Sequence, residues 1–322
     1  MACTANQYPH KTNRLSRCLR AALSISPLLG LVAQPGRKMG ISIYIRVKDE
    51  ADWIELSILS IQDFADEIIV VDNGSQDGTI EKIKRLQNKL KIPLALYEQP
   101  SLNFTDLNNF ALVKTNFHWV MKWDGDFVAH TSGENNISGL RERLLALDSR
   151  RYYFIYLRLI NLNGDLLHQD SREQVHIEEY IHTYSSKAVF IHTGTYEAIH
   201  TPKFYEVLFW YKPYIFHINV KPARKMLKRF FWNSWLKLEG TSPHPKFEDY
   251  VQSQLPETFG TDSWDEAQQA CILRASEYCV RYNQELFGPY PDLLKEHLKN
   301  PKYTLLYDGD KITGRLESGS CP

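Results

Sequence analysis

Short apolar runs and longer mixed segments alternate along the first half of the chain. The runs at residues 41–45, 67–72, 93–97 and 119–123 are rich in β-branched or aromatic residues and have the length of strands. The segments between them carry apolar side chains at helical spacing. This strand–helix alternation predicts an α/β fold, with a mostly parallel, Rossmann-like sheet flanked by helices.

The second half of the chain follows a different pattern. Residues 152–160 predict a long strand, the Asn-Gly-Asp sequence at residues 163–165 predicts a hairpin turn, and residues 188–191 and 204–210 predict further strands. We expect these strands to be antiparallel additions to the sheet. A helical C-terminal region follows, in which residues 263–287 predict helix.

These patterns divide the chain into three parts. We expect an N-terminal extension at residues 1–39 that is poorly ordered or loosely docked, an α/β domain at residues 40–240, and the helical region at residues 241–322. The extension has basic residues before an apolar run at residues 21–33. A signal peptide, a docked helix and a translation start at Met39 are therefore three interpretations that remain open for it.

Charge and cysteine content exclude some classes of protein. The chain has 38 basic and 38 acidic residues, and this balance argues against a protein that binds nucleic acid. Its five cysteines are scattered and show no zinc-ligand spacing. Such a set fits reduced thiols, so we expect a cytoplasmic location, including the inner face of the membrane.

Polar side chains follow the predicted strands at ends that should share one edge of the sheet. Right-handed crossovers place the loops after the first, second and fourth strands along the same rim. Open α/β sheets bind ligands beyond these strand ends. The rim gathers Arg46, Lys48 and Glu50 from the first loop, Asp72 and Asn73 from the second, and Asp124 and Asp126 from the fourth strand.

This set of side chains suits a nucleotide and a metal ion. Asp124 and Asp126 offer two carboxylates of the kind that Mg²⁺ or Mn²⁺ prefers, although a capped surface turn is the alternative interpretation of this motif. Asp72 can accept hydrogen bonds from a base or a ribose. Arg46 or Lys48 can neutralise a diphosphate.

Three segments, in this order, are similar to one known family. Residues 46–50 (RVKDE), 64–79 (FADEIIVVDNGSQDGT) and 119–126 (WVMKWDGD) resemble the family-2 glycosyltransferases, over about residues 41–128. The resemblance implies a GT-A fold and a metal-dependent, inverting transfer of a sugar from a nucleotide-diphospho-sugar. A UDP-sugar is the favoured donor, and the acceptor would be a glycan or a lipid-linked molecule in cell-surface polysaccharide synthesis.

The resemblance also implies roles for parts of the chain. Residues 40–130 would bind the nucleotide sugar and residues 131–240 the acceptor. Asp72 would contact the base, Asp124 the ribose or the sugar, and Asp126 the metal ion.

Two further residues gain a role from the resemblance. Asn109 stands where the family often has an asparagine before the D-x-D strand and would support the donor site; a helix-surface asparagine is the alternative. A histidine often completes the metal shell in this fold, at a position that His217 matches. A lone histidine on an apolar strand is otherwise a hydrogen-bonded core residue.

An inverting transfer also needs a base for the acceptor hydroxyl, and a carboxylate serves best. The candidates are Glu178, Glu179 and Glu197. Related families place this acid after a glycine-containing loop and before the metal-binding histidine, an order that favours Glu197; an ordinary strand-edge glutamate is the alternative. Lys221 follows the His217 strand and could meet a phosphate.

Residues 222–238 are basic and aromatic and predict an amphipathic helix. The aromatic face of such a helix is either buried in the domain or rests on an anionic membrane as a peripheral contact.

Two other functions remain open from the sequence alone. An apolar strand that ends in D-x-D also suits a phosphohydrolase, with Asp124 as the nucleophile and Asp126 as the acid/base, although three strand–helix units precede the motif here. A non-catalytic protein that binds nucleotide sugars would keep the same fold without turnover.

Overall fold

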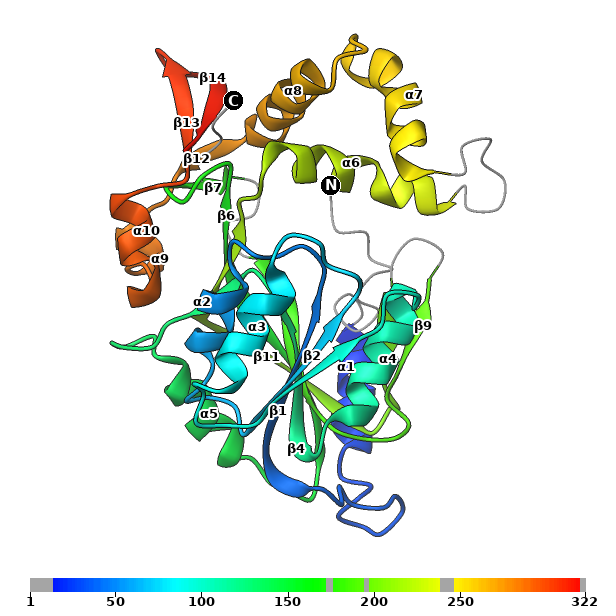
Figure 1. Ribbon diagram of the computed structural model, residues 1–322. Coiled ribbons are helices and arrows are strands. Elements are labelled where there is room, and N and C mark those ends of the chain that lie inside the picture. The colour runs from blue at the N-terminus through cyan, green and yellow to red at the C-terminus, as the bar shows by residue number, and fades with distance from the viewer. Residues whose placement is uncertain (1–13, 172–175, 194–196, 238–245, 319–322) are drawn as a thin grey trace. The chain divides into compact units, whose positions relative to one another are not determined.

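The computed structural model describes residues 14–171, 176–193, 197–237 and 246–318 (Figure 1). Their contacts form two compact units. The first unit comprises residues 1–159, 175–217 and 287–293, and the second comprises residues 160–174, 218–286 and 294–322. The predicted domain boundaries after residues 39 and 240 stay predictions.

The first four predicted strands form the parallel part of the first unit. Strand β1 lies between β2 and β4, and β3 lies beside β2, with all three pairs parallel. The predicted α/β fold class is therefore confirmed. The strands span Lys38–Val47 (β1), Glu67–Asp72 (β2), Leu94–Glu98 (β3) and Phe117–Asp124 (β4).

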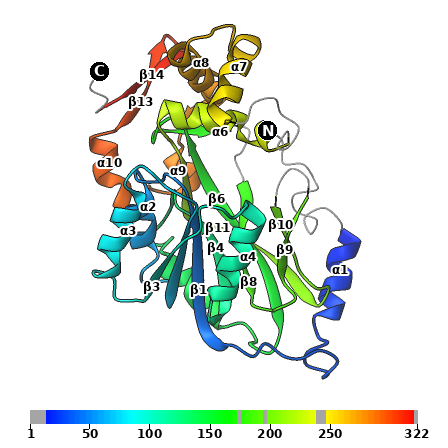
Figure 2. The ribbon, with the colours of Figure 1, turned by 45° about the vertical axis from the view of Figure 1, so that its right-hand side comes forward.

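Side chains of these strands alternate between two apolar layers. In β1, Ile43 and Ile45 belong to the layer with α2, α3 and α5, whereas Tyr44 belongs to the layer with α4. Figures 1 and 2 show α2 and α3 on one side of the strands and α4 on the other. Burial on both faces explains the continuous apolar runs in the sequence. The helices span Ile54–Ser60 (α2), Thr79–Gln87 (α3), Phe104–Lys114 (α4) and Ile137–Leu145 (α5).

Antiparallel strands extend the sheet, as predicted. Strand β8 pairs with β4, β6 pairs with β8, and β11 pairs with β5 and β6. Strands β9 and β10 form a separate antiparallel pair that packs in the layer of α4. The strands span Phe127–Ala129 (β5), Tyr152–Asn163 (β6), His176–Thr183 (β8), Val189–His192 (β9), Glu197–His200 (β10) and Tyr205–Asn219 (β11).

The second unit contains the predicted hairpin after β6. Leu162 of β6 pairs with Gln169 of β7 (His168–Asp170), and β7 pairs with β12 (Cys279–Arg281). The helix predicted over residues 263–287 is wrong in its second part. Helix α8 (Trp264–Ser276) ends before β12, and only Gln284–Phe287 is helical again, as α9. Pairing with β7 therefore outweighs the local helical pattern in this segment.

Helix α6 (Ala223–Lys237) packs against α7 (Phe247–Phe259) and α8 in the second unit. Its Leu227 and Phe231 are buried together with Tyr250 and Val251 of α7. The predicted helix at residues 222–238 is confirmed, and these side chains of its apolar face are part of the core. The peripheral membrane contact predicted through this helix would need that face at the surface.

The remaining elements are short. Strands β13 (Tyr303–Asp308) and β14 (Lys311–Glu317) form the hairpin at the end of the second unit. Helix α1 (Arg14–Leu23) belongs to the first unit. The segment before β13 contains η2 (Asp292–Leu294) and α10 (Lys295–Lys299). In the described part of the chain, every helix is too short or too polar to cross a lipid bilayer.

Candidate active site

The carboxyl ends of β1, β2 and β4 meet at one rim, as predicted. The register places Arg46 of β1 beside Asp124 of β4, and Val47 of β1 beside Asp72 of β2. Asp72 and Asp124 are therefore separated by one strand, which corresponds to about 10 Å between their backbones. The parallel sheet thus unites side chains that are far apart in the sequence.

A tight turn after β2 fixes the carboxylate of Asp72. Its Oδ2 accepts hydrogen bonds from the backbone N–H groups of Gly74 (2.8 Å) and Ser75 (2.9 Å), and its Oδ1 accepts one from the Ser75 hydroxyl. Gly74 has a φ of 83°, a conformation that favours glycine. The carboxylate is thereby held at the strand end, and its contact with a nucleotide base stays a prediction.

The loop after β1 is joined to that turn by hydrogen bonds. The N–H of Asp49 donates to Ser75 Oγ at 2.8 Å, and the Asp49 carboxylate accepts the N–H of Gln76 at 2.7 Å. The N–H of Glu50 donates to Thr79 Oγ1 at 2.8 Å. The two loops therefore form one wall of the rim.

Gly125 allows the D-x-D turn to pass close to this wall. A Cβ atom at position 125 would lie 3.3 Å from Cβ and Cγ of Glu50 and 3.3 Å from Cδ1 of Ile54. A side chain there would push its neighbours apart, because interiors are close-packed. Glu50 therefore lies directly against the turn that carries Asp124 and Asp126.

Asp124 forms an ion pair with Lys122 on the same strand. Asp124 Oδ1 lies 2.8 Å from Lys122 Nζ, and the side chains are 35 % and 16 % exposed. Burial opposes both charges, but mutual attraction prevails, so the pKa of Asp124 is lowered and the pKa of Lys122 is raised. Lys122 is not among the residues that the sequence pattern predicts for the site. Lys122 and Asp124 are two residues apart on a strand, so their side chains share one face, and this spacing could have indicated the ion pair.

Asp126 and His217 come together although they are far apart in the sequence of the first unit. His217 Nε2 lies 3.3 Å from Asp126 Oδ2, and the side chains are 15 % and 5 % exposed. Strand β5, which follows Asp126, pairs with β11 so that Phe127 stands opposite His217. Two of the three side chains predicted as metal ligands are thus neighbours, whereas the third, Asp124, pairs with Lys122. Metal binding itself stays a prediction.

The donor atoms of this pair fit Mn²⁺ or Mg²⁺. A carboxylate oxygen suits both ions, and an imidazole nitrogen is accepted more readily by Mn²⁺. Within the described ranges, no cluster of three or more His, Cys, Asp or Glu side chains could hold a metal ion. The pair would therefore hold an ion only together with oxygen atoms from a substrate or water, as is usual for Mg²⁺ at phosphate sites.

Glu197, the favoured base candidate, lies on β10 and pairs with Arg46. Arg46 Nη1 is 2.5 Å from Glu197 Oε1, and both side chains are less than one-fifth exposed. Asn108 Nδ2 donates to the same oxygen at 3.4 Å. Burial alone would raise the pKa of Glu197, but Arg46 and Lys122 outweigh it and lower the pKa. The carboxylate is therefore ionised at neutral pH.

The other two base candidates lie on β8. Glu179 is buried, and its Oε1 accepts the N–H of Tyr180 at 3.0 Å. Its charge raises the pKa of both Tyr44, where burial is the larger cause, and Lys122, so it lies near the same group of side chains. The side chain of Glu178 lies outside the described residues.

Two predicted donor-site amides are engaged with the backbone. Asn73 Nδ2 donates to the carbonyls of Gln99 (3.0 Å) and Leu102 (3.1 Å). Asn109 donates to the carbonyl of Phe190 at 3.0 Å and accepts its N–H at 2.8 Å. Asn109 thus ties α4 to β9, and the donor-site roles of both residues stay predictions.

The two predicted phosphate-binding lysines differ in their surroundings. Lys48 is exposed at the end of β1 in the first unit. Lys221 is buried in the second unit, where its carbonyl accepts a hydrogen bond of 2.6 Å from Arg315 Nη2. A contact of either lysine with phosphate stays a prediction.

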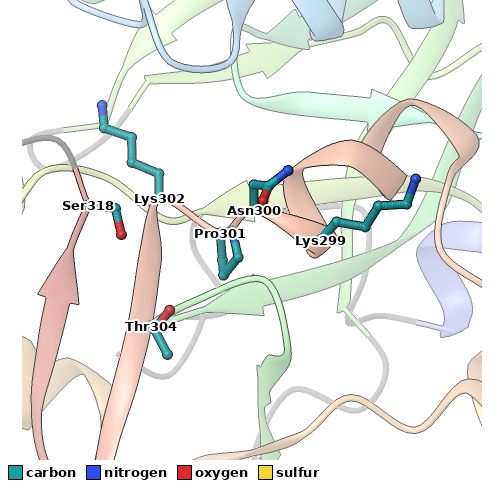
Figure 3. Close-up of a pocket in the computed structure, with 6 residues that line it drawn as sticks. All are labelled: Lys299, Asn300, Pro301, Lys302, Thr304 and Ser318. Carbon is teal, nitrogen blue, oxygen red and sulfur yellow. The ribbon is translucent and has the colours of Figure 1, made fainter.

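The second unit carries an open hollow of about 520 Å³ beside the β13–β14 hairpin. Its lining contains two lysines but no carboxylate or histidine, so it lacks a base and an acidic metal ligand. Figure 3 shows the side chains that line it: Lys299, Asn300, Pro301, Lys302, Thr304 and Ser318.

Comparisons with known proteins match parts of this chain. The sequence model of "Glycosyl transferase family 2" matches residues 42–132. An uncharacterized glycosyltransferase of Rickettsia bellii is 34 % identical over 86 residues, which is 27 % of each chain. One from Rickettsia typhi is 30 % identical over 149 residues, which is 46 % of this chain and 47 % of that protein. The matches span less than half the length of either relative.

Two solved structures are similar to most of the chain at low sequence identity. Residues 1–349 of Staphylococcus aureus TarS give a TM-score of 0.40 at 13 % identity, covering 87 % of this chain and 98 % of that one. The mannosyltransferase PcManGT of Pyrobaculum calidifontis gives a TM-score of 0.38 at 16 % identity, covering 81 % of this chain and 87 % of that one. The resemblance found in the sequence is confirmed by the match of residues 42–132 to the glycosyltransferase family 2 model and by the two glycosyltransferase relatives.

Proposed function

We propose that the protein is a metal-dependent, inverting glycosyltransferase. It would move a sugar from a nucleotide-diphospho-sugar, with a UDP-sugar favoured, to a hydroxyl group of a glycan or a lipid-linked acceptor. The observation that carries this proposal lies in the family-2 segment and its neighbours. There Asp126, two residues beyond β4, lies beside His217, and Asp72 lies at the end of β2. Arg46, near the end of β1, pairs with Glu197 at the start of β10.

The donor would lie across the ends of β1, β2 and β4. The turn that holds Asp72 is at one side of β1, and Asp124 and Asp126 are at the other, which matches a nucleoside followed by a diphosphate. Asp126 and His217 would hold Mn²⁺ or Mg²⁺, which when bound offsets the negative charge on the leaving diphosphate. Lys122 neutralises Asp124 and so limits repulsion between this carboxylate and the phosphates.

Glu197 would accept the proton of the acceptor hydroxyl. Arg46 and Asn108 both donate to its Oε1, and we assign proton uptake to Oε2. The acceptor oxygen forms a bond to the anomeric carbon as the bond from that carbon to the diphosphate oxygen breaks. The nucleoside diphosphate leaves with the electron pair, and the acceptor proton passes to Glu197. Attack opposite the leaving group inverts the anomeric configuration.

Two buried polar atoms beside Glu197 also favour a ligand at this place. The Tyr44 hydroxyl and Asn108 Oδ1 have no hydrogen-bond partner among the described residues. Buried polar atoms are nearly always paired, so such atoms call for a bound water or ligand. Asn108 already contacts Glu197, and the charge of Glu197 acts on the Tyr44 hydroxyl.

The experiment is an assay of nucleoside-diphosphate release from a panel of nucleotide sugars, with and without Mn²⁺. The expected result is release that requires Mn²⁺, with kcat about 100-fold lower or more in Glu197→Gln and donor affinity unchanged. The exposed Asp63 is the matched control, and Asp63→Asn should behave as wild type. Full turnover in Glu197→Gln would overturn its role as the base. Failure of every nucleotide sugar to bind would overturn the proposed function.

A further inference from the structure

Helix α1 is docked on the first unit through its polar face. Arg20 is buried, and its guanidinium donates to the carbonyls of Pro202 (2.8 Å) and Thr201 (3.3 Å) just after β10. Three residues earlier, the guanidinium of Arg17 lies 4.5 Å above the ring of Phe209. Figure 2 shows α1 at the outer edge of this unit. Arg20 is therefore turned into the protein, whereas Arg17 remains exposed beside Phe209.

The chain that follows α1 is also anchored through polar groups. Ser24 is buried, and its hydroxyl accepts a hydrogen bond of 2.6 Å from Arg151. The hydroxyl of Tyr152 donates to the carbonyl of Ala33 at 3.1 Å. Anchors at both ends thus hold residues 20–33 against the unit.

The opposite face of this segment is apolar and exposed. Leu19 is 49 % exposed, Leu29 is 63 % exposed and Leu31 is 74 % exposed, and Leu15, Ile25 and Leu28 are also among the exposed large apolar residues. Those six residues are a third of all such residues in the described chain. A segment in water normally buries its apolar side chains, so these exposed leucines beside a buried Arg20 indicate an apolar partner.

The charge of the segment decides what that partner is. Residues 1–48 contain no Asp or Glu, and residues 1–38 contain six cations: Lys11, Arg14, Arg17, Arg20, Arg37 and Lys38. Arg20 is buried, whereas Arg17 and Lys38 are exposed and could meet an anionic partner. The complete chain has no net charge, so its positive charge is concentrated at this end. Two copies that met through this surface would bring like charges together, which opposes a symmetric dimer. An anionic lipid surface offers both apolar volume and opposite charge.

We infer that residues 14–31 form a docking surface for an anionic lipid bilayer, with Leu19, Leu29 and Leu31 entering the boundary between headgroups and acyl chains. The surface lies flat on the bilayer and does not span it. This inference does not depend on the proposed transfer reaction, because it rests on the exposed apolar face and the local charge alone.

The test is sedimentation of the full chain with vesicles of phosphatidylcholine, with and without phosphatidylglycerol. Wild type should sediment with the anionic vesicles, less with neutral ones, and less at high salt. Leu19→Glu/Leu31→Glu should lower the partition coefficient about tenfold or more, since each change removes apolar contact and adds repulsion from anionic headgroups. Val113 is 70 % exposed on α4 and provides the matched control, so Val113→Glu should bind as wild type.

Three results would overturn the inference. Wild type could fail to bind either vesicle, the double variant could bind as tightly as wild type, or light scattering could show a dimer that the double variant abolishes. Thermal unfolding and nucleotide-sugar binding should be unchanged in the double variant, because Leu19 and Leu31 are exposed. A loss of folding in that variant would show that the two leucines are core residues and would equally contradict the inference.

Discussion

Arg46 and Glu197 form an ion pair across the rim, with 2.5 Å between Nη1 and Oε1 and less than one-fifth of either side chain exposed. The two residues come from β1 and β10, which are distant in the sequence. Because the guanidinium lowers the pKa of the carboxyl group, the pair would set the pH range in which Glu197 serves as the proposed base.

Arg46→Met should therefore move the acidic limb of the kcat–pH profile to higher pH, by about one unit. Burial raises the pKa of Glu197 and Arg46 lowers it, so removal of Arg46 raises the pKa and protonates the base at a higher pH. The measurement is kcat against pH at saturating donor. Arg46→Lys keeps the charge and should shift the limb less. If the acidic limb of the profile does not move in Arg46→Met, the Arg46–Glu197 ion pair does not set the pKa that limits kcat.

Gly125→Ala should impair activity by displacing the D-x-D turn. The new methyl group would lie 3.3 Å from Glu50 and Ile54, and relief of this crowding must move either the wall or the two aspartates. We expect a loss of about 1–3 kcal/mol in the free energy of unfolding, together with weaker Mn²⁺-dependent donor binding. Urea unfolding and donor titration measure the two effects. Gly133→Ala serves as a control, because no atom lies within 4 Å of a Cβ there, although its φ of 68° adds some strain of its own. Wild-type donor binding in Gly125→Ala would show that the turn tolerates a side chain.

Arg141 and Asp66 should make stability depend on pH. Arg141 donates two hydrogen bonds of 2.9 Å to the Asp66 carboxylate, which also accepts the N–H of Ile41 at 2.8 Å. Burial raises the pKa of Asp66, but these hydrogen bonds outweigh it and lower the pKa. The stabilisation is therefore fully present above the unfolded pKa, near 4, and is lost as the pH falls through the lower folded pKa.

Arg141→Met should cost about 1 kcal/mol in the free energy of unfolding at neutral pH, and the difference from wild type should shrink in acid. It should not vanish, because Arg141 also donates to the carbonyl of Phe64 at 2.6 Å, a bond that does not titrate. Urea unfolding of both proteins at neutral and acidic pH measures this. An equal difference at both pH values would refute the assignment to Asp66.

The local pattern of apolar and polar residues was sufficient to predict the strands of the parallel sheet. Strand β2 begins and ends at the predicted residues, because its apolar run is bounded by charged and turn residues. The segment after Ser276 was mispredicted as helix because its pairing with β7 is a tertiary contact that leaves no periodic signal. Sequence patterns could therefore predict the strands that form the rim, but not a strand such as β12 that depends on pairing with a distant segment.

The candidate site also contains some residues whose positions the sequence predicts and others whose positions depend on tertiary contacts. The rim position of Asp72 and Asp124 follows from strand order, which the sequence predicts. The proximity of His217 to Asp126 depends on the pairing of β5 with β11, and it was expected only through the family resemblance. In α4, Asn109 was selected but Asn108 reaches Glu197, since one residue turns a helix by about 100° and the pattern does not fix that phase.

The central claim is that Asp126 holds a metal ion for a nucleotide diphosphate, and calorimetric titration of UDP with and without Mn²⁺ tests it most directly. Wild type and Asp63→Asn should bind UDP more tightly with Mn²⁺ than without it. In Asp126→Asn, UDP affinity with Mn²⁺ should fall by about tenfold or more while the thermal unfolding temperature changes little. UDP affinity in Asp126→Asn equal to that of wild type with Mn²⁺ would contradict the claim.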